Sequence, residues 1–144
     1  MLGRDWIVAH IPHQDAMCLI DEVLSWSTER IACRAASHRL DTNPLRREGR
    51  LGASCAIEYA AQAMAIHGAL LGNEEQKARP GVLVSVRGVE FSVDRVDDVA
   101  EDLEIEAEQM VAEKERVLYQ FTVRAGVKTL CSGRATVVLA LELP

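Results

Sequence analysis

Three polar residues follow one side of a segment that is otherwise almost entirely apolar. Ser54, Glu58 and Gln62 are four residues apart within "GASCAIEYAAQAMAIHGALLG", residues 52–72. At about 100° per residue these positions drift only about 80° around a helix axis, so they form one stripe. A carboxylate in a buried helix must be paired or neutralised, because its desolvation is costly. Glu58 is therefore either a satisfied structural residue or a proton-transfer group, and the spacing leaves both readings open.

Two further residues of this segment could contribute to a site. His67 lies nine residues after Glu58, about 180° around the helix, which predicts a core or interface histidine rather than a partner for Glu58. Gly52 stands at the start of the helix, where free backbone N–H groups could bind a carbonyl oxygen or a phosphate. It could equally be an ordinary loop glycine.

Four of the sixteen cationic side chains lie within twelve residues just before this segment: Arg39, Arg46, Arg47 and Arg50. On a chain of net charge −6 this group could dock an acidic carrier protein. It could as well be a solvated loop whose charges aid solubility.

Composition limits the remaining classes of function. With 144 residues, 49% of them hydrophobic and 26% charged, the chain matches a soluble globular protein and predicts one domain over residues 1–144. A sequence pI near 5.2 disfavours nucleic acid and anionic membranes as partners. The 52–72 segment has about the length of a membrane span, but its polar residues indicate a buried core helix.

The cysteines and the first residues indicate the compartment. Four scattered cysteines show no C-x-x-C spacing for a zinc or redox site, and "MLGRDWIVAH" lacks the long apolar core of a signal peptide. We therefore expect reduced thiols in a cytoplasmic protein, with no metal and no cofactor.

The elements around the helix are mainly strands. Two short apolar runs, 16–27 and 29–37, predict an opening strand pair, and polar loops fill 38–50 and 72–81. Four strand-like segments follow: 82–93, 103–113, 116–125 and 127–143. Ala125-Gly126 is a plausible hairpin turn, and Gly133 is a candidate bulge. The order predicts an α+β hotdog fold, in which a curved antiparallel sheet wraps one long central helix.

Three stretches resemble one known family. "IPHQDAMCLIDEVL" is similar to the L-P-H-R-x-P-F-L-L-V-D-R-V-L opening of the (3R)-hydroxyacyl-acyl carrier protein dehydratases of fatty-acid synthesis. "EYAAQA" resembles the E-A-x-A-Q-x of their central helix, and "RPGVLVSVRGVEFSVDRVDDVAEDLEIEAE" follows their later strands. The resemblance covers most of the chain, weakly in the last two strands. More loosely, the chain resembles a dehydratase-like branch found beside aryl-polyene and polyketide gene sets.

The resemblance implies a hotdog dimer with two sites at its interface, each using a histidine from one subunit and the helix carboxylate of the other. By position, Glu58 is that carboxylate and Gln62 the glutamine that follows it. Ile11, Pro12 and His13 match the segment that lines the acyl tunnel.

One expected residue is missing from its usual place. The family pattern G-H-F-P-x-x-P-x-x-P-G-V-L-x-x-E puts its catalytic histidine fourteen residues before the glutamate, where this chain has Pro44. Dehydration of a 3-hydroxyacyl thioester needs a base for the α-proton and an acid for the departing hydroxyl. Either His13 or His38 replaces that histidine, or a histidine-bearing hotdog paralogue completes the site in a heterodimer. The site residues we expect are Glu58 and His13 for catalysis and, for substrate binding, Ile11, Pro12, Gly52 and Gln62.

Three functions remain open. The first is dehydration of a 3-hydroxyacyl chain held by an acyl carrier protein. The second is thioester hydrolysis, in which Glu58 acts as base or nucleophile and a Gly52 N–H or Gln62 polarises the carbonyl. The third is a non-catalytic acyl-binding or assembly partner.

Overall fold

A computed structural model describes residues 2–11, 13, 15–72 and 81–139. Its elements are β1 (Leu2–Gly3), α1 (Arg4–His10), β2 (Glu22–Trp26), β3 (Arg30–Ala35), α2 (Cys55–Leu71), β4 (Gly81–Phe91), β5 (Leu103–Ala112), β6 (Arg116–Ala125) and β7 (Lys128–Leu139). Short 3₁₀ turns cover Asp15–Met17 and Ser37–Arg39. Most of the loop expected over 72–81 and the end of the last expected strand lie outside the described residues.

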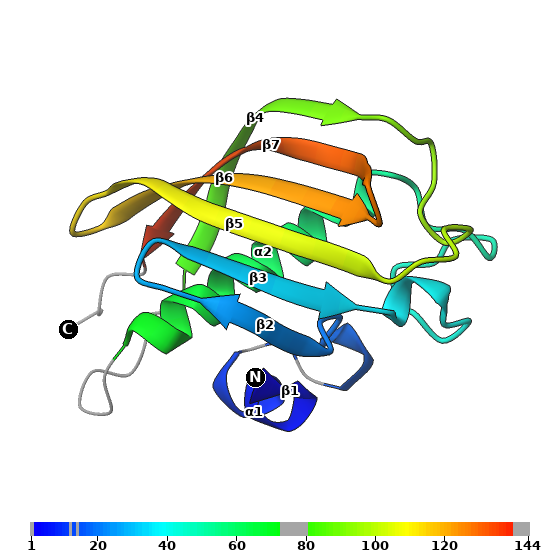
Figure 1. The fold of residues 1–144 in the computed structure, drawn as a ribbon, viewed down its shortest axis with the longest axis horizontal. Coiled ribbons are helices and arrows are strands. Elements are labelled where there is room, and N and C mark those ends of the chain that lie inside the picture. The colour runs from blue at the N-terminus through cyan, green and yellow to red at the C-terminus, as the bar shows by residue number, and fades with distance from the viewer. Residues whose placement is uncertain (1, 12, 14, 73–80, 140–144) are drawn as a thin grey trace.

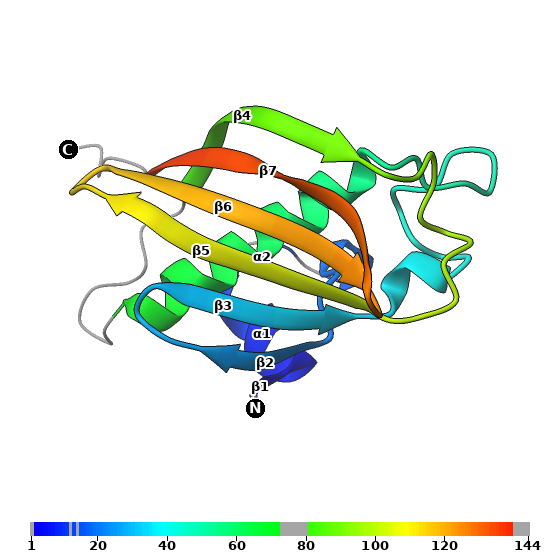
Figure 2. The ribbon, with the colours of Figure 1, turned by 45° about the horizontal axis from the view of Figure 1, so that its top comes forward.

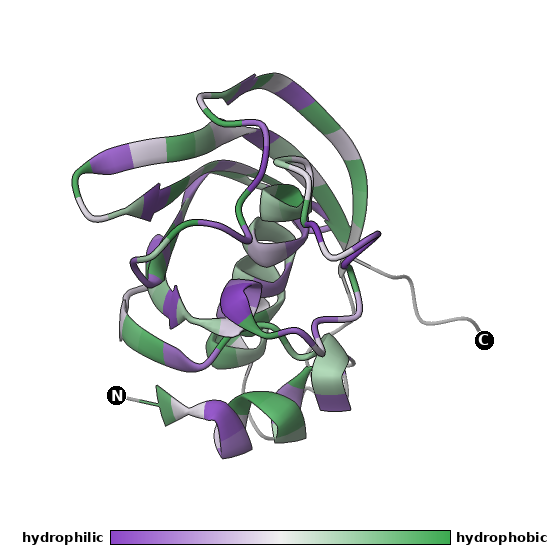
Figure 3. Ribbon diagram, turned by 90° about the vertical axis from the view of Figure 1, so that its right-hand side faces the viewer, coloured by the Kyte–Doolittle hydropathy of each residue, from purple (hydrophilic) through white to green (hydrophobic). Residues whose placement is uncertain are grey.

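One antiparallel sheet curves around α2 (Figures 1 and 2). Its strand order is β1-β2-β3-β5-β6-β7-β4, so β4 follows the helix in sequence but closes the far edge of the sheet. The helix packs on one face, mainly against β3, β5 and β6. Figure 3 shows the sheet curling around the helix from one end. The α+β arrangement predicted from the sequence is confirmed.

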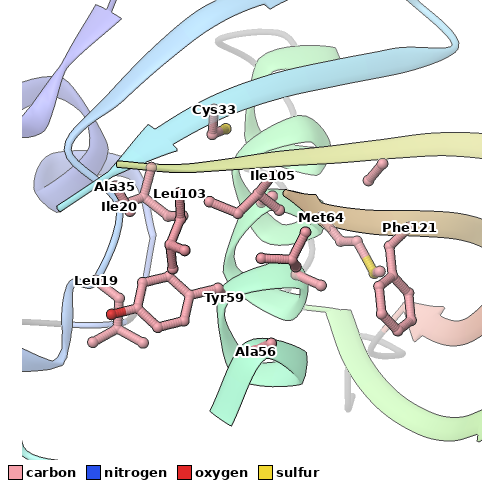
Figure 4. Close-up of a cluster of buried hydrophobic side chains, with 14 of the residues drawn as sticks. Leu19, Ile20, Cys33, Ala35, Ala56, Tyr59, Met64, Leu103, Ile105 and Phe121 are labelled. Atoms are coloured by element: carbon pink, nitrogen blue, oxygen red, sulfur yellow. The ribbon is translucent and has the colours of Figure 1, made fainter. Parts of the chain in front are cut away.

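Alternating strands build the core between helix and sheet. In β5 the side chains of Leu103, Ile105 and Ala107 are buried, whereas the glutamates between them face the other side. Small helix residues, Ala56, Ala60 and Ala63, are fully buried and allow the helix to lie close to the strands. Larger side chains from both layers fill the remaining space (Figure 4).

The last hairpin and Gly133 show how the sheet is shaped. Ala125 pairs with Lys128, and Gly126 takes φ +59° at the first position of the two-residue turn, as a type II′ turn requires. Gly133 itself pairs regularly with Phe121. The irregularity lies opposite Gly133, in β4 between Arg87 and Glu90, where Gly88 has φ +59°. The expected bulge is therefore in the neighbouring strand rather than at Gly133.

The N-terminal helix α1 was not predicted. It has seven residues, and only Ile7 among them is buried. Contacts from elsewhere in the chain hold it: the Arg4 guanidinium donates hydrogen bonds to the Cys18 carbonyl (2.6 Å) and the Asp15 carbonyl (2.7 Å). Of the helices in the described part of the chain, none is long and apolar enough to cross a membrane.

Candidate functional site

Glu58 and His13 lie side by side. Glu58 sits in the first turn of α2, where the helix dipole favours a carboxylate. His13 follows α1 in the loop before β2, and its Nε2 is 3.4 Å from Glu58 Oε1. Their side chains keep 37% and 27% of their exposure, so both can be reached from solvent in a single chain. Glu58 is less buried than the apolar segment around it suggested, because it faces this loop rather than the sheet.

Gln62 ties this loop to the helix. Its side chain is fully buried, and its Oε1 accepts a hydrogen bond from the Leu19 N–H (2.9 Å). Its Nε2 donates to the Met17 carbonyl (2.7 Å) and, at 3.5 Å, to Glu58 Oε1. The amide therefore binds protein groups on both ends, and the same Glu58 oxygen faces both Gln62 and His13.

The segment with the other expected tunnel residues is only partly described. Ile11 is 5% exposed and belongs to the hydrophobic core. Pro12 lies outside the described residues. His13 Nδ1 is buried and has no hydrogen-bond partner among the described residues, so only its Nε2 faces a titratable group there.

Gly52 lies in the turn that leads into α2. It is exposed and forms a β-bridge with Arg95, through Ala53 N–H to the Asp94 carbonyl and Val96 N–H to the Leu51 carbonyl. Its own N–H donates no hydrogen bond within the described part of the chain. This turn is braced further by Asp97, whose carboxylate accepts from the Leu51 N–H at 2.8 Å. The neighbouring Arg95 guanidinium holds the pKa of the Asp97 carboxyl well below its usual range.

His38 and His67 make their hydrogen bonds elsewhere. His38 is fully buried, and its Nε2 donates to the Val99 and Glu101 carbonyls, both at 3.0 Å. Burial lowers the His38 pKa. These bonds hold the loop before β5, so His38 supports that loop and His13 is the histidine beside Glu58.

His67 is a core residue, as its helix position predicted. Its Nδ1 accepts from the Tyr119 hydroxyl (2.8 Å), and its Nε2 donates to the Ser27 carbonyl (2.8 Å). Gln109 Nε2 donates in turn to the Tyr119 oxygen (3.2 Å). This arrangement satisfies a neutral imidazole, and burial lowers the His67 pKa.

The loop arginines have separate roles. Arg39 binds Asp102 and the Ala100 carbonyl. Arg46 donates to the carbonyls of Leu40, Gly49 and His38 within its own loop. Arg47 and Arg50 are exposed and form no ion pair within the described residues. Half of the expected basic group is therefore structural.

A buried polar network beside the site was missed at the sequence level. The Tyr59 hydroxyl lies 2.7 Å from Ser37 Oγ and accepts from Asn43 Nδ2 (3.2 Å), and Ser37 Oγ donates to the Leu19 carbonyl (2.7 Å). Figure 4 shows the Tyr59 hydroxyl pointing toward Leu19. A tyrosine next to Glu58 in an apolar helix was the available signal, because a buried hydroxyl needs a partner.

The pair offers a carboxylate and an imidazole, and the neighbouring Cys55 adds no activated thiol. Cys55 precedes Glu58 by one turn, and burial raises the pKa of its thiol, which disfavours a nucleophilic thiolate. Among the described residues no group of His, Cys, Asp and Glu is arranged to hold a metal ion. The pair of Glu58 and His13 is therefore suited to proton transfer.

Comparison with known families agrees with this chemistry. A family model described as ApeP-like, ApeP dehydratase, matches residues 6–143. A search of the curated proteins found no match.

Solved structures share the fold. The dehydratase heterocomplex ApeI:P from Xenorhabdus doucetiae contains a chain with a TM-score of 0.80 and 20% identity, covering 94% of this chain and 91% of that one. A mutant thioesterase from Pseudomonas aeruginosa aligns with a TM-score of 0.66 and 14% identity, covering 97% and 100%. A thioesterase from Haemophilus influenzae has a TM-score of 0.62 and 15% identity, covering 95% and 84%. At these identities the structures show the hotdog fold alone.

Proposed function

Because the chain belongs to the ApeP-like dehydratase family, we propose that it removes water from a 3-hydroxyacyl thioester with Glu58 and His13 as its acid–base pair. The observation that carries this proposal is the 3.4 Å approach of His13 Nε2 to Glu58 Oε1. No other histidine of the described chain is hydrogen-bonded or ion-paired to Glu58.

Glu58 and His13 together hold one transferable proton before the reaction and one after it, so no other proton donor or acceptor is needed. One member accepts the proton from C2 of the substrate while the other gives its proton to the hydroxyl on C3, so that the C3–O bond breaks and water leaves. The electrons of the C2–H bond form the C2=C3 double bond of the enoyl product. The pair then again holds one proton, on the opposite member.

Neighbouring groups are suited to binding the thioester. The Gly52 N–H donates no hydrogen bond within the described residues and stands before α2, where helix N–H groups and the dipole stabilise negative charge on a carbonyl oxygen. Pro12 is apolar and directly precedes His13, which suits an acyl chain, whereas Ile11 packs in the hydrophobic core. Gln62 contributes by holding the loop and Glu58 in place, because its amide is fully buried and both of its ends already bind protein groups.

We propose further that the chain works as a dimer, with itself or with a hotdog paralogue. Its similarity to a chain of a dehydratase heterocomplex supports this assembly. A paralogue with its own histidine could still borrow Glu58. In that case the chain alone would be a weak dehydratase, because the loss of one positioned acid or base costs about 10²- to 10⁴-fold in rate.

The test is an assay of the purified chain with 3-hydroxyacyl and saturated acyl thioesters. Enoyl absorbance is expected from the first, and Glu58→Gln and His13→Ala should each lower it by about 10²- to 10⁴-fold while the protein stays folded. His10→Ala is the matched control, because His10 is exposed, stacks on Trp6 and bonds its carbonyl, and none of its described contacts involves Glu58 or His13. That variant should keep wild-type turnover.

Other outcomes would overturn the proposal. Free thiol released from saturated substrates without enoyl product would indicate a thioesterase. Wild-type turnover in Glu58→Gln would place the chemistry elsewhere. The activity could also be weak, rise only when the chain is co-expressed with a histidine-bearing hotdog protein, and be unaffected by His13→Ala. In that case the catalytic histidine would be the partner's and not His13.

A further inference from the structure

The His13 ring has no second hydrogen bond of its own among the described residues. Its Nε2 lies 3.4 Å from Glu58 Oε1, whereas its Nδ1 is buried without a partner there. In many histidines that transfer protons, a hydrogen bond to the second ring nitrogen fixes the tautomer and the orientation of the ring. Because no described group does so for His13, the backbone of its loop has to place the imidazole.

The loop after His13 needs contacts from outside to keep its shape. Asp15 takes φ 52°, a left-handed conformation that is unfavourable for residues other than glycine, although aspartate tolerates it better than most. Inside the loop, the Cys18 N–H donates to the Asp15 carbonyl at 3.1 Å. The Arg4 guanidinium binds the carbonyls of the same two residues. The turn is therefore fixed as a unit, and its place over α2 depends on the residue that follows it.

That residue, Leu19, is bound at both of its backbone polar groups. Its N–H donates to Gln62 Oε1 at 2.9 Å, and its carbonyl accepts from Ser37 Oγ at 2.7 Å. The Leu19 side chain is fully buried. Gln62 belongs to α2, and Ser37 begins the 3₁₀ turn after β3. Two separate elements thus fix this peptide, and with it the end of the loop that carries His13.

Ser37 is itself tied to α2 through Tyr59. The Ser37 hydroxyl has one proton and donates it to the Leu19 carbonyl, so it accepts from the Tyr59 hydroxyl, which lies 2.7 Å away. The Tyr59 oxygen in turn accepts from Asn43 Nδ2 at 3.2 Å. All of these side chains are buried. The donors run in one direction and end at the Leu19 carbonyl, and neighbouring bonds in such a chain strengthen one another.

We propose that Ser37, held by Tyr59, is a positioning residue whose hydroxyl sets the distance of His13 from Glu58. Tyr59 follows Glu58 directly in α2, so the hydrogen bonds tie the loop to the turn of the helix that carries the carboxylate. Both hydroxyls are buried and already bonded, so they act through His13 and not on the substrate. This role rests on the proposed function, because it serves the same acid–base pair. A displacement of about 1 Å in such a site costs up to about 10²-fold in rate.

Ser37→Ala is the test, and Asn43→Ala is the matched control. Ser37→Ala removes the bond to the Leu19 carbonyl and should lower kcat about tenfold or more, with KM within about twofold of wild type. Asn43→Ala also removes buried hydrogen bonds, to the Ser37 carbonyl and the Tyr59 oxygen, but leaves the bonds that end at Leu19 in place. Its kcat should therefore stay as in wild type. Ser37→Thr keeps a hydroxyl and should restore most of the turnover.

Three further measurements separate positioning from a general loss of stability. Tyr59→Phe keeps the buried ring and removes only the donor to Ser37, so it should lower kcat less than Ser37→Ala does, and it carries the test if Ser37→Ala folds poorly. In a His13→Ala background, Ser37→Ala should lower kcat no further, because the group that it positions is gone. The Cε1–H resonance of His13, assigned by its loss in His13→Ala, should shift in Ser37→Ala and stay in place in Asn43→Ala.

The results distinguish this role from the proposed function. Wild-type kcat and an unmoved His13 resonance in Ser37→Ala would overturn the role of Ser37 and leave the dehydratase intact. Equal losses of kcat in Ser37→Ala and Asn43→Ala, or losses that add to that of His13→Ala, would also overturn it, because they would indicate general destabilisation. If the wild-type chain turns over no 3-hydroxyacyl thioester, the proposed function fails, and the His13 resonance alone decides whether Ser37 positions that ring.

Discussion

One oxygen of Glu58 faces two side chains from different parts of the chain. Its Oε1 lies 3.4 Å from His13 Nε2 and 3.5 Å from Gln62 Nε2. Within the described residues, no partner is recorded for Oε2. A carboxylate held on one side in this way presents its other oxygen in a fixed direction, which is what proton transfer to a substrate requires.

Gln62 is expected to control both stability and turnover. Gln62→Ala would leave the Leu19 N–H and the Met17 carbonyl without partners, and each such buried group costs about 1–3 kcal/mol. We therefore expect a loss of about 2–4 kcal/mol in the free energy of unfolding, measured in urea, together with a lower kcat. Asn43→Ala removes another buried carboxamide and is the control: it should destabilise the protein and spare kcat. Equal kcat in the two variants would show that Gln62 does not position Glu58.

His67 predicts how stability depends on pH. Burial lowers its pKa in the folded protein below the ordinary value of about 6.5, so the unfolded chain binds more protons just below that pH. The stability that depends on neutral His67 should therefore be fully present above about pH 6.5. Below that pH the free energy of unfolding should fall, by at most about 1.4 kcal/mol per pH unit for one group.

Urea unfolding at pH 8, 7, 6 and 5 measures this dependence. Burial also lowers the pKa of His38, so His38 contributes to the same pH dependence. Arg95 lowers the pKa of the Asp97 carboxyl, so Asp97 changes the stability only below the ordinary pKa range of carboxyl groups. His67→Gln should thus reduce the slope between pH 7 and 5 without removing it. An unchanged slope would show that His67 does not contribute.

The sequence predicted which residues belong to the candidate site better than it predicted which of them lie next to each other. Glu58 and His13 were both named from the sequence, and their closeness follows from contacts that no local pattern contains. Arg4 fixes the Asp15–Cys18 turn, and Gln62 binds Met17 and Leu19, more than forty residues away along the chain. Such long-range hydrogen bonds decide where the His13 loop lies, and spacing alone cannot supply them.

Among the elements, the strands and the long helix were predicted closely and α1 was not. The apolar alternation of β5 and the length of the 52–72 segment are strong local signals. Seven residues with one buried side chain carry little periodic signal, and tertiary contacts stabilise this helix. The bulge predicted at Gly133 was also misplaced: the register shift lies in β4, between Arg87 and Glu90, where Gly88 has φ +59°.

Gly133 is expected to accept a side chain only if its neighbours shift, at a cost in stability. A Cβ there would meet Phe121 Cζ at 3.0 Å and Val89 Cγ2 at 3.1 Å. Gly133→Ala should therefore lower the free energy of unfolding by about 1–3 kcal/mol, the usual cost of overpacking. Phe121→Leu shortens the obstructing side chain, so the double variant should be more stable than the sum of the single changes predicts. Simple additivity in urea unfolding would contradict this account.

Of the two edge strands of the sheet in the described residues, β1 has two residues and β4 is long. β4 ends the strand order, runs for eleven residues and has no strand on its outer side within the described residues. Leu83, Val84 and Phe91 on this strand are exposed by 36%, 54% and 44%. A long edge strand with apolar side chains is a template for pairing with another chain.

We therefore expect association through β4. Wild-type protein should sediment as a dimer at micromolar concentration, with itself or with a hotdog paralogue, and its Tm should rise with concentration. Leu83→Lys/Val84→Lys should weaken association at least tenfold, because charged residues on an edge strand oppose pairing. Val127→Lys is the control, since Val127 is fully exposed in the turn between β6 and β7, away from β4. Dimers that survive in the β4 variant and dissociate in the Val127 variant would place the interface at the other end of the sheet. A monomer under every condition would contradict the proposed dimer.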